Sequence, residues 1–177
     1  MVSPKIDRLP SLAYFQAMRQ ALLIIDVQAS FAPPPDLIAG IEKLLPLMPS
    51  AATVERHDEA VVPFRAQLNW APGPSDECLV AADKVFIKHG YAPTPETVAY
   101  LGALKTDRIL VCGIQADTCV LAAGFALFDA GLHPTLIADL TIGSSLDRSG
   151  ALGVSLWRHH FGKVIDRYED VLAALSA

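Results

Sequence analysis

The chain has 177 residues, which is long enough for one domain with a full hydrophobic core. Its net charge of −5 argues against a nucleic-acid-binding protein, which would need a basic face. No apolar run approaches the roughly 20 residues of a membrane span, and polar residues interrupt the N-terminal segment where a secretory signal needs an apolar stretch. Three cysteines in a chain with no export signal indicate a cytoplasmic protein with free thiols.

Strand-like and helix-like segments alternate along the whole chain. The segments expected as strands are, in chain order, residues 21–26, 60–64, 84–88, 109–113, 135–138 and 163–165. Those expected as helices are residues 36–48, 94–104, 117–130, 144–160 and 168–175. Asp36 is a candidate N-cap and Pro95 suits a first helical turn, whereas Pro63 weakens the second strand. Repeated β-α units of this kind predict an α/β protein with a parallel sheet covered by helices on both faces.

Three reactive side chains follow expected strands, at the edge where an open α/β sheet binds its ligands. Asp26 closes the first strand, Lys88 ends the third, and Cys119 lies past the fourth, at the start of a helix. The free amides and the positive end of the helix dipole at such a position favour a thiolate over a thiol. This arrangement predicts a cysteine hydrolase. An irregular segment, residues 65–82, would lie above the same edge as a lid or specificity loop.

From about residue 21 to the C-terminus, the sequence resembles the isochorismatase-like cysteine hydrolases, which include nicotinamidases and carbamoyl-sarcosine amidohydrolases. Each shared motif is weak alone, but the ordered set is fairly specific. The motifs are Asp26-Val27-Gln28 with Phe31, Lys88 with Tyr91, residues 113–120 and residues 139–145. The resemblance implies that Asp26, Lys88 and Cys119 form a catalytic triad.

The resemblance also implies a three-layer α/β/α fold with a six-stranded, mostly parallel sheet. We expect one domain over residues 1–177, in which residues 1–19 are an N-terminal extension of uncertain structure. The expected strand order is 3-2-1-4-5-6, which places Asp26 and Cys119 on neighbouring strands. Lys88 would then reach in from about two strand spacings away, near 10 Å.

Further roles follow from the resemblance. It implies a cis peptide at Ile114–Gln115 and assigns the amides of Gln115 and Cys119 to binding the oxyanion of the reaction. The candidate residues of the substrate pocket are Gln28, Phe31, Trp70 and Tyr91. The predicted reaction is attack of the thiolate on a small amide or carbamoyl compound, with Asp26 carrying the proton and water hydrolysing the resulting thioester. The resemblance also implies a homo-oligomer.

Departures from the family pattern bear on the substrate and on metals. Nicotinamidases carry an Asp and several His as metal ligands after the second strand. That region is expected here at residues 64–71, which contain no carboxylate–histidine pair, so we expect no metal and no other cofactor. A common threonine of the cysteine loop is Ala116 here, and a phenylalanine that often follows the Lys-Tyr segment is missing from residues 92–95. A nicotinamidase is therefore disfavoured, and the substrate stays open.

Three other functions remain alternatives. One is isochorismatase-type hydrolysis of a vinyl ether, which some members perform without a cysteine; the presence of Cys119 favours amide chemistry instead. Another is an inactive member of the fold that only binds its ligand. The third is a nucleotide-binding domain, but residues 26–30 after the first strand contain no glycine-rich phosphate loop.

Overall fold

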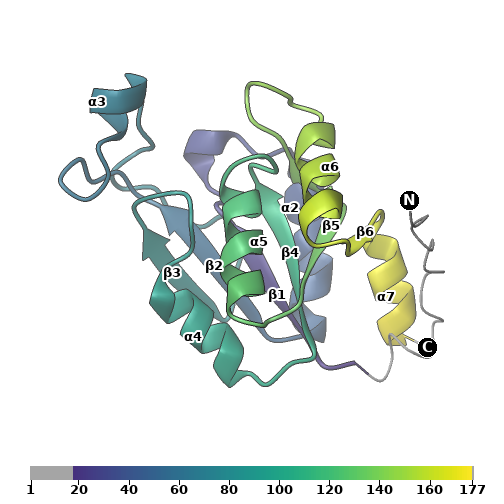
Figure 1. Cartoon of the computed structure of the whole chain (residues 1–177). Helices are drawn as coiled ribbons and strands as arrows, with labels where there is room; N and C mark the ends of the chain where they lie inside the picture. Colours follow the sequence, from purple (N-terminus) through teal and green to yellow (C-terminus); the bar gives the residue numbers. More distant parts are fainter. Residues whose placement is uncertain (1–17, 177) are drawn as a thin grey trace, which may run out of the picture.

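A computed structural model of the chain describes residues 18–176 (Figure 1). The extension predicted for residues 1–19 falls almost entirely outside these residues. Within the described part of the chain, no helix is both long and apolar enough to cross a membrane.

The centre of the fold is a six-stranded parallel sheet. Its strands are β1 (Gln20–Ile25), β2 (Ser50–Glu55), β3 (Lys84–Lys88), β4 (Arg108–Ile114), β5 (Pro134–Ile142) and β6 (Val164–Ile165). The order across the sheet is β3-β2-β1-β4-β5-β6, and every neighbouring pair is parallel. The predicted fold class and strand order are confirmed.

Helices cover both faces of the sheet, which makes three layers (Figure 1). The helical elements are η1 (Ala29–Phe31), α2 (Pro35–Leu44), η2 (Leu45–Leu47), α3 (Phe64–Leu68), α4 (Pro95–Ala103), α5 (Cys119–Asp129), α6 (Ala151–His160) and α7 (Tyr168–Ser176). Side chains of α2 and α7 join one hydrophobic core, and side chains of α4, α5 and α6 join the other. The short helix α3 projects from the end of the sheet instead of covering a face (Figure 1).

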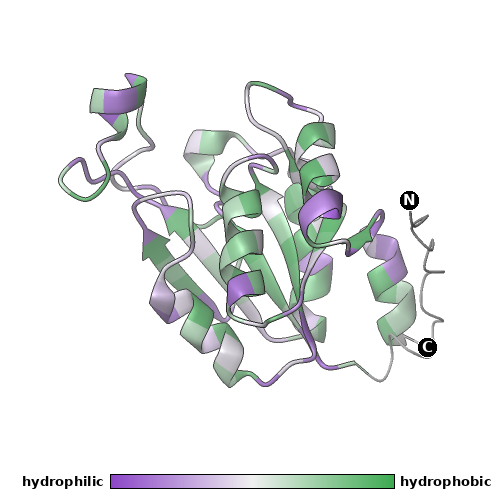
Figure 2. Ribbon diagram, in the orientation of Figure 1, coloured by the Kyte–Doolittle hydropathy of each residue, from purple (hydrophilic) through white to green (hydrophobic). Residues whose placement is uncertain are grey.

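The central strands are apolar because both of their faces are covered. Every residue of β1 is buried, and alternate side chains enter opposite cores: Leu22 and Ile24 on one side, Leu23 and Ile25 on the other. In Figure 2 the sheet is largely hydrophobic, whereas the outer faces of the helices carry polar residues.

The second strand lies elsewhere than its sequence pattern suggested. The prediction of a strand at residues 60–64 is wrong: β2 is Ser50–Glu55, and Phe64 begins α3. The chain turns before α3 because the amides of Val61 and Val62 donate to the carbonyl of Asp58, while Pro63 has no amide proton to offer a sheet. The true strand is short of large apolar residues, and its small side chains fit between two covered faces.

Two helices begin later than predicted. The helix expected from residue 144 starts at Ala151, because the Asp147 carboxylate accepts from the amides of Ser149 and Leu152, and Gly150 adopts a left-handed φ of 76°. The helix expected from residue 117 starts at Cys119. The remaining elements agree with the predictions to within a few residues, except that β5 runs to Ile142.

Candidate active site

The side chains of Asp26, Lys88 and Cys119 meet at the carboxyl edge of the sheet. The Nζ atom of Lys88 lies 2.7 Å from Asp26 Oδ2 and 3.5 Å from Cys119 Sγ. All three residues are buried, with exposed fractions of 0%, 1% and 4% in chain order. Strand order explains the convergence: β1 and β4 are neighbours, and the long lysine side chain spans the distance from β3.

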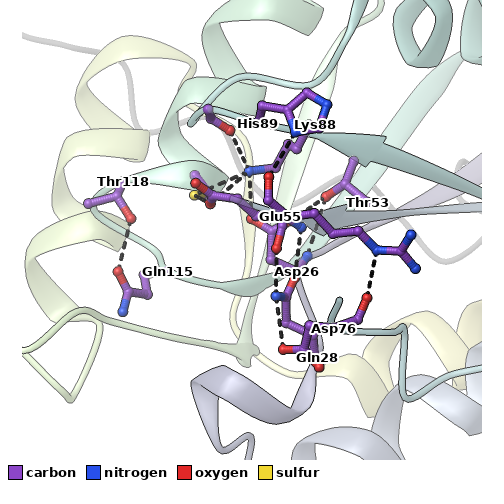
Figure 3. Close-up of polar contacts among 12 residues, drawn as sticks. Asp26, Gln28, Thr53, Glu55, Asp76, Lys88, His89, Gln115 and Thr118 are labelled. Atoms are coloured by element: carbon purple, nitrogen blue, oxygen red, sulfur yellow. Dashed lines mark hydrogen bonds and ion pairs between the residues drawn. The ribbon is translucent and has the colours of Figure 1, made fainter. Parts of the chain in front are cut away.

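A fourth ionisable residue, Glu55, belongs to the same cluster and escaped the sequence analysis. Its Oε2 atom lies 3.1 Å from Lys88 Nζ and accepts a hydrogen bond from the Cys119 thiol at 3.3 Å (Figure 3). Glu55 ends β2 just as Asp26 follows β1, so an acid at a strand end was the available signal. Glu55 was missed because the second strand was predicted at residues 60–64 and not at Ser50–Glu55.

Polar neighbours hold the two acids in place. Thr53 Oγ1 donates to Asp26 Oδ1 at 2.7 Å. Gln28 Nε2 donates to the carbonyl oxygen of Glu55, and Gln28 Oε1 accepts from the Glu55 amide. Because Gln28 is fully buried and both ends of its amide are bound to the backbone of Glu55, it positions that residue; the structure does not place it as an open pocket wall (Figure 3).

The loop before the cysteine leaves some of its backbone amides without a hydrogen-bond acceptor among the described residues. The Ile114–Gln115 peptide is cis, at the position that the resemblance indicated. The amides of Ala116, Thr118 and Val120 donate to backbone carbonyls, whereas within residues 18–176 those of Gln115, Asp117 and Cys119 donate to none. Free amides next to the thiol are the donors that an oxyanion requires.

Hydrogen bonds and close packing with neighbouring elements fix the conformation of this loop. The Asp117 carboxylate accepts from the Ser144 amide at 2.8 Å and from its hydroxyl at 2.6 Å, which ties the loop to the segment after β5. Gly153 of α6 packs directly on Ala116, and a Cβ at this glycine would overlap the Ala116 backbone. Gly113, with a φ of 114°, likewise lets β4 approach the Ile25 backbone.

Aromatic rings form a chain beside the cluster. Phe31 contacts Trp70 and Phe64 contacts both Trp70 and Tyr91, with ring centroids 5.4–6.3 Å apart. Trp70 and Tyr91 are about half exposed, at 50% and 45%. Three of the four predicted pocket residues therefore share one aromatic group, with Phe64 as an unpredicted member.

Burial and the two acids control the electrostatics of the site. Burial raises the pKa of Cys119 well above its ordinary value, and Asp26 and Glu55 raise it further against the opposing charge of Lys88. Burial also raises the pKa of Asp26 and of Glu55, although Lys88 opposes both shifts. Burial alone would lower the pKa of Lys88, but the neighbouring Asp26, Cys119 and Glu55 raise it above its ordinary value. Burial and the two acids therefore favour the thiol of Cys119, in the opposite direction to the helix start, which favours a thiolate.

The loop in which nicotinamidases carry their metal ligands begins directly after Glu55 in this chain, and not at residues 64–71 as predicted. The loop that follows the second strand contains a carboxylate–histidine pair, His57 and Glu59, whose Nε2 and Oε2 atoms are 3.0 Å apart. Among residues 18–176, the one set of three potential ligands that converge within 4.8 Å is Asp26, Glu55 and Cys119. Lys88 Nζ contacts all three, so a metal ion would have to displace a buried ammonium group. These residues do not fit a metal site.

Comparisons with known proteins agree with this fold. Residues 20–169 match the family model of the isochorismatase domain. A search of curated protein sequences finds no match.

Solved structures share the fold at low sequence identity. An isochorismatase-like hydrolase from Alkaliphilus metalliredigens has a TM-score of 0.74 at 15% identity, over 88% of this chain and 98% of that one. An N-carbamoylsarcosine amidase from Thermoplasma acidophilum has a TM-score of 0.70 at 17% identity, over 86% and 98%. A pyrazinamidase of Pyrococcus horikoshii, in complex with zinc, has a TM-score of 0.70 at 17% identity, over 83% and 98%.

Proposed function

The chain belongs to the isochorismatase family of hydrolases, and on this basis we propose that it hydrolyses a small amide or carbamoyl compound through Cys119. The observation that carries the proposal is the buried contact of the Cys119 thiol with an ammonium group and a carboxylate, beside free backbone amides. A buried cysteine with a structural role needs none of these neighbours. The amidases among the similar structures support the same reaction class.

In the proposed reaction, a carboxylate of the cluster takes the thiol proton as sulfur attacks the carbonyl carbon; the family resemblance assigns this role to Asp26. Lys88 balances the negative charge that develops on sulfur. The amides of Gln115 and Cys119 bind the oxyanion. The C–N bond breaks as nitrogen takes the proton, which leaves a thioester. Water then hydrolyses the thioester and restores the thiol.

Cys119→Ala tests the proposal. A screen of small amides and carbamoyl compounds for ammonia release supplies the substrate, and the variant should lose turnover on it while keeping the fold by circular dichroism. Mass spectrometry of wild-type protein quenched during turnover should show an acyl adduct on Cys119. Cys112→Ala is the matched control, because Cys112 is a fully buried core residue that should affect only stability.

The alternatives are outcomes of this experiment. Turnover that survives Cys119→Ala would show that covalent catalysis is wrong and would place the chain with family members that work by acid catalysis alone, as in the hydrolysis of a vinyl ether. A wild-type protein that binds small amides but forms no adduct with any of them would be an inactive member of the fold.

A further inference from the structure

The cluster holds two acids for one cysteine, and they differ in their contacts. Both carboxylate oxygens of Asp26 have a polar contact. Oδ1 accepts a hydrogen bond from Thr53. Oδ2 lies 2.7 Å from Lys88 Nζ in an ion pair whose geometry is not that of a hydrogen bond. Glu55 Oε2 is shared between Lys88 and the thiol. Glu55 Oε1 is buried and has no hydrogen-bond partner among the described residues.

The thiol of Cys119 donates a hydrogen bond to Glu55. The hydrogen bond from Cys119 Sγ ends on Glu55 Oε2, so proton transfer along it requires no rearrangement of either side chain. Asp26 is bound by a hydroxyl and an ammonium group, both of which favour its ionised form. Burial raises the pKa of both acids, and Glu55 accepts the hydrogen bond from the thiol, so Glu55 is placed to take the proton when sulfur attacks.

We propose that Glu55 is a fourth catalytic residue, the acid–base that carries the proton of Cys119 and activates the hydrolytic water. The proposal rests on the proposed function and refines it by giving Asp26 the task of positioning Lys88. As sulfur attacks, the S–H bond breaks and an O–H bond forms on Glu55. Glu55 then gives this proton to the leaving nitrogen as the C–N bond breaks, and it returns to the carboxylate.

The second half of the reaction uses the same group. The free Oε1 of Glu55 is available to accept a hydrogen bond from water next to the thioester. Glu55 takes a proton from this water as its oxygen bonds to the carbonyl carbon. The C–S bond then breaks, sulfur leaves as thiolate, and Glu55 returns the proton to it. The product is a carboxylic acid, and the thiol and the carboxylate are both regenerated.

Hydrolysis of p-nitrophenyl acetate separates the two halves, because its leaving group needs no proton. Wild-type protein should show a burst of nitrophenolate from acetylation of Cys119, followed by steady turnover limited by water attack. Glu55→Gln should slow the burst at neutral pH, because the thiol loses its proton acceptor, and the burst should recover as the pH rises and Cys119 ionises without that acceptor. The steady turnover of this variant should fall by about 10²-fold or more, the usual contribution of general acid–base catalysis. Acetylated Cys119 should accumulate and be visible by mass spectrometry.

Matched variants separate this role from a structural one. Glu77→Gln removes an exposed carboxylate from the segment that connects β2 to β3, and this variant should behave as wild type. Lys88→Met should weaken burst and steady phases together. Glu55→Asp keeps a carboxylate and should regain part of the steady rate, and it serves as the second probe if Glu55→Gln does not fold.

Two results would overturn the inference alone: a steady rate in Glu55→Gln equal to that of wild type, or a burst in Glu55→Gln that does not recover as the pH rises. Wild-type protein that shows no acetylation of Cys119 would instead remove the proposed function itself.

Discussion

At the scale of single residues, Lys88 is the centre of the site. Its ammonium group has three protons but four neighbours, namely Asp26, Glu55, the carbonyl oxygen of Gly90 and Cys119 Sγ. The sulfur contact, at 3.5 Å, is the longest of the four. In the resting protein Lys88 therefore balances the two buried acids first, and the thiol gains its stabilisation only when one acid takes up a proton.

Substitutions on either side of this balance should move the Cys119 pKa in opposite directions. Lys88→Met removes the one cation that lowers the Cys119 pKa, so we expect that pKa to rise and alkylation by iodoacetamide at neutral pH to slow. Asp26→Asn removes a negative charge, so the pKa should fall and alkylation should accelerate. Turnover should fall steeply in both variants, with less effect on substrate binding. Alkylation rates followed from pH 6 to pH 10, a range of about four units around the ordinary thiol pKa, measure the shifts. Equal shifts of the same sign would contradict this account.

Sequence reasoning found the residues whose neighbours along the chain are distinctive. Asp26 and Cys119 each follow a long apolar strand, and Lys88 ends a strand at its exact predicted limits. Glu55 was missed because the alanines of β2 lack the large apolar side chains that mark a strand. The helix start predicts a lowered pKa for Cys119, whereas burial and two acids raise it. The helix start can be recognised from neighbouring residues in the chain, but the two acids come from other strands and only the fold brings them to the thiol.

At the scale of elements, the position of α6 controls the cysteine loop. Gly153→Ala places a methyl group against the Ala116 backbone, so either α6 or the loop must move. We expect a loss of stability of about 1–3 kcal/mol, the usual cost of overpacking, and a lower kcat because the free amides shift. Gly102→Ala is the control, since its Cβ would meet only Leu132 at 3.9 Å and should stabilise α4 by up to about 1 kcal/mol. Urea unfolding together with turnover measures both; a Gly153→Ala protein with wild-type stability would refute the packing argument.

The ion pairs of Lys88 with the two buried acids lead to a prediction about metals. Because Lys88 occupies the centre of the one converging ligand set among the described residues, purified protein should lack stoichiometric Zn, Fe or Mn, and chelators should not inhibit it. His57→Ala should change neither metal content nor chelator response, since His57 pairs with Glu59 and not with Glu55. Elemental analysis that finds one tightly held metal ion per chain would overturn the prediction.

Element boundaries were predictable where chemistry is local. Thr94 caps α4 through the Thr97 amide, and Pro95 occupies the first turn, as the residue types indicated. The start of α6 was not predictable, because residues 144–150 continue the helical spacing while Asp147 binds the backbone in a turn. Competition between a side-chain turn and a helix is decided by contacts with the rest of the fold.

At the scale of the whole molecule, the family resemblance implies a homo-oligomer. The edge strand β3 leaves Val85 and Ile87 over 40% exposed, and α3 and its neighbours expose Val61, Leu68 and Trp70. Exposed apolar side chains of this number suit an interface between protein chains. We expect sedimentation velocity at micromolar concentration to show a dimer or a larger assembly. A monomer under these conditions would remove the support for this prediction.

Stability should fall as the solution becomes alkaline, because the folded protein holds its thiol protons more tightly than the unfolded chain. Burial raises the pKa of Cys112, and burial with the neighbouring acids raises the pKa of Cys119, both from an ordinary value near 9.0. Above that pH the thiols of the unfolded chain ionise while those of the folded protein do not. Each therefore lowers the free energy of unfolding by about 1.4 kcal/mol per pH unit until its folded-state pKa is reached. Lys88 adds to the loss above its own ordinary pKa of 10.5, because its pKa is raised in the folded state. Urea unfolding at pH 8, 9 and 10, steps of about one unit, should show this decline. Cys119→Ala and Cys112→Ala should each flatten it by one thiol's share, and a stability that is constant over this range would show that the folded thiols titrate normally.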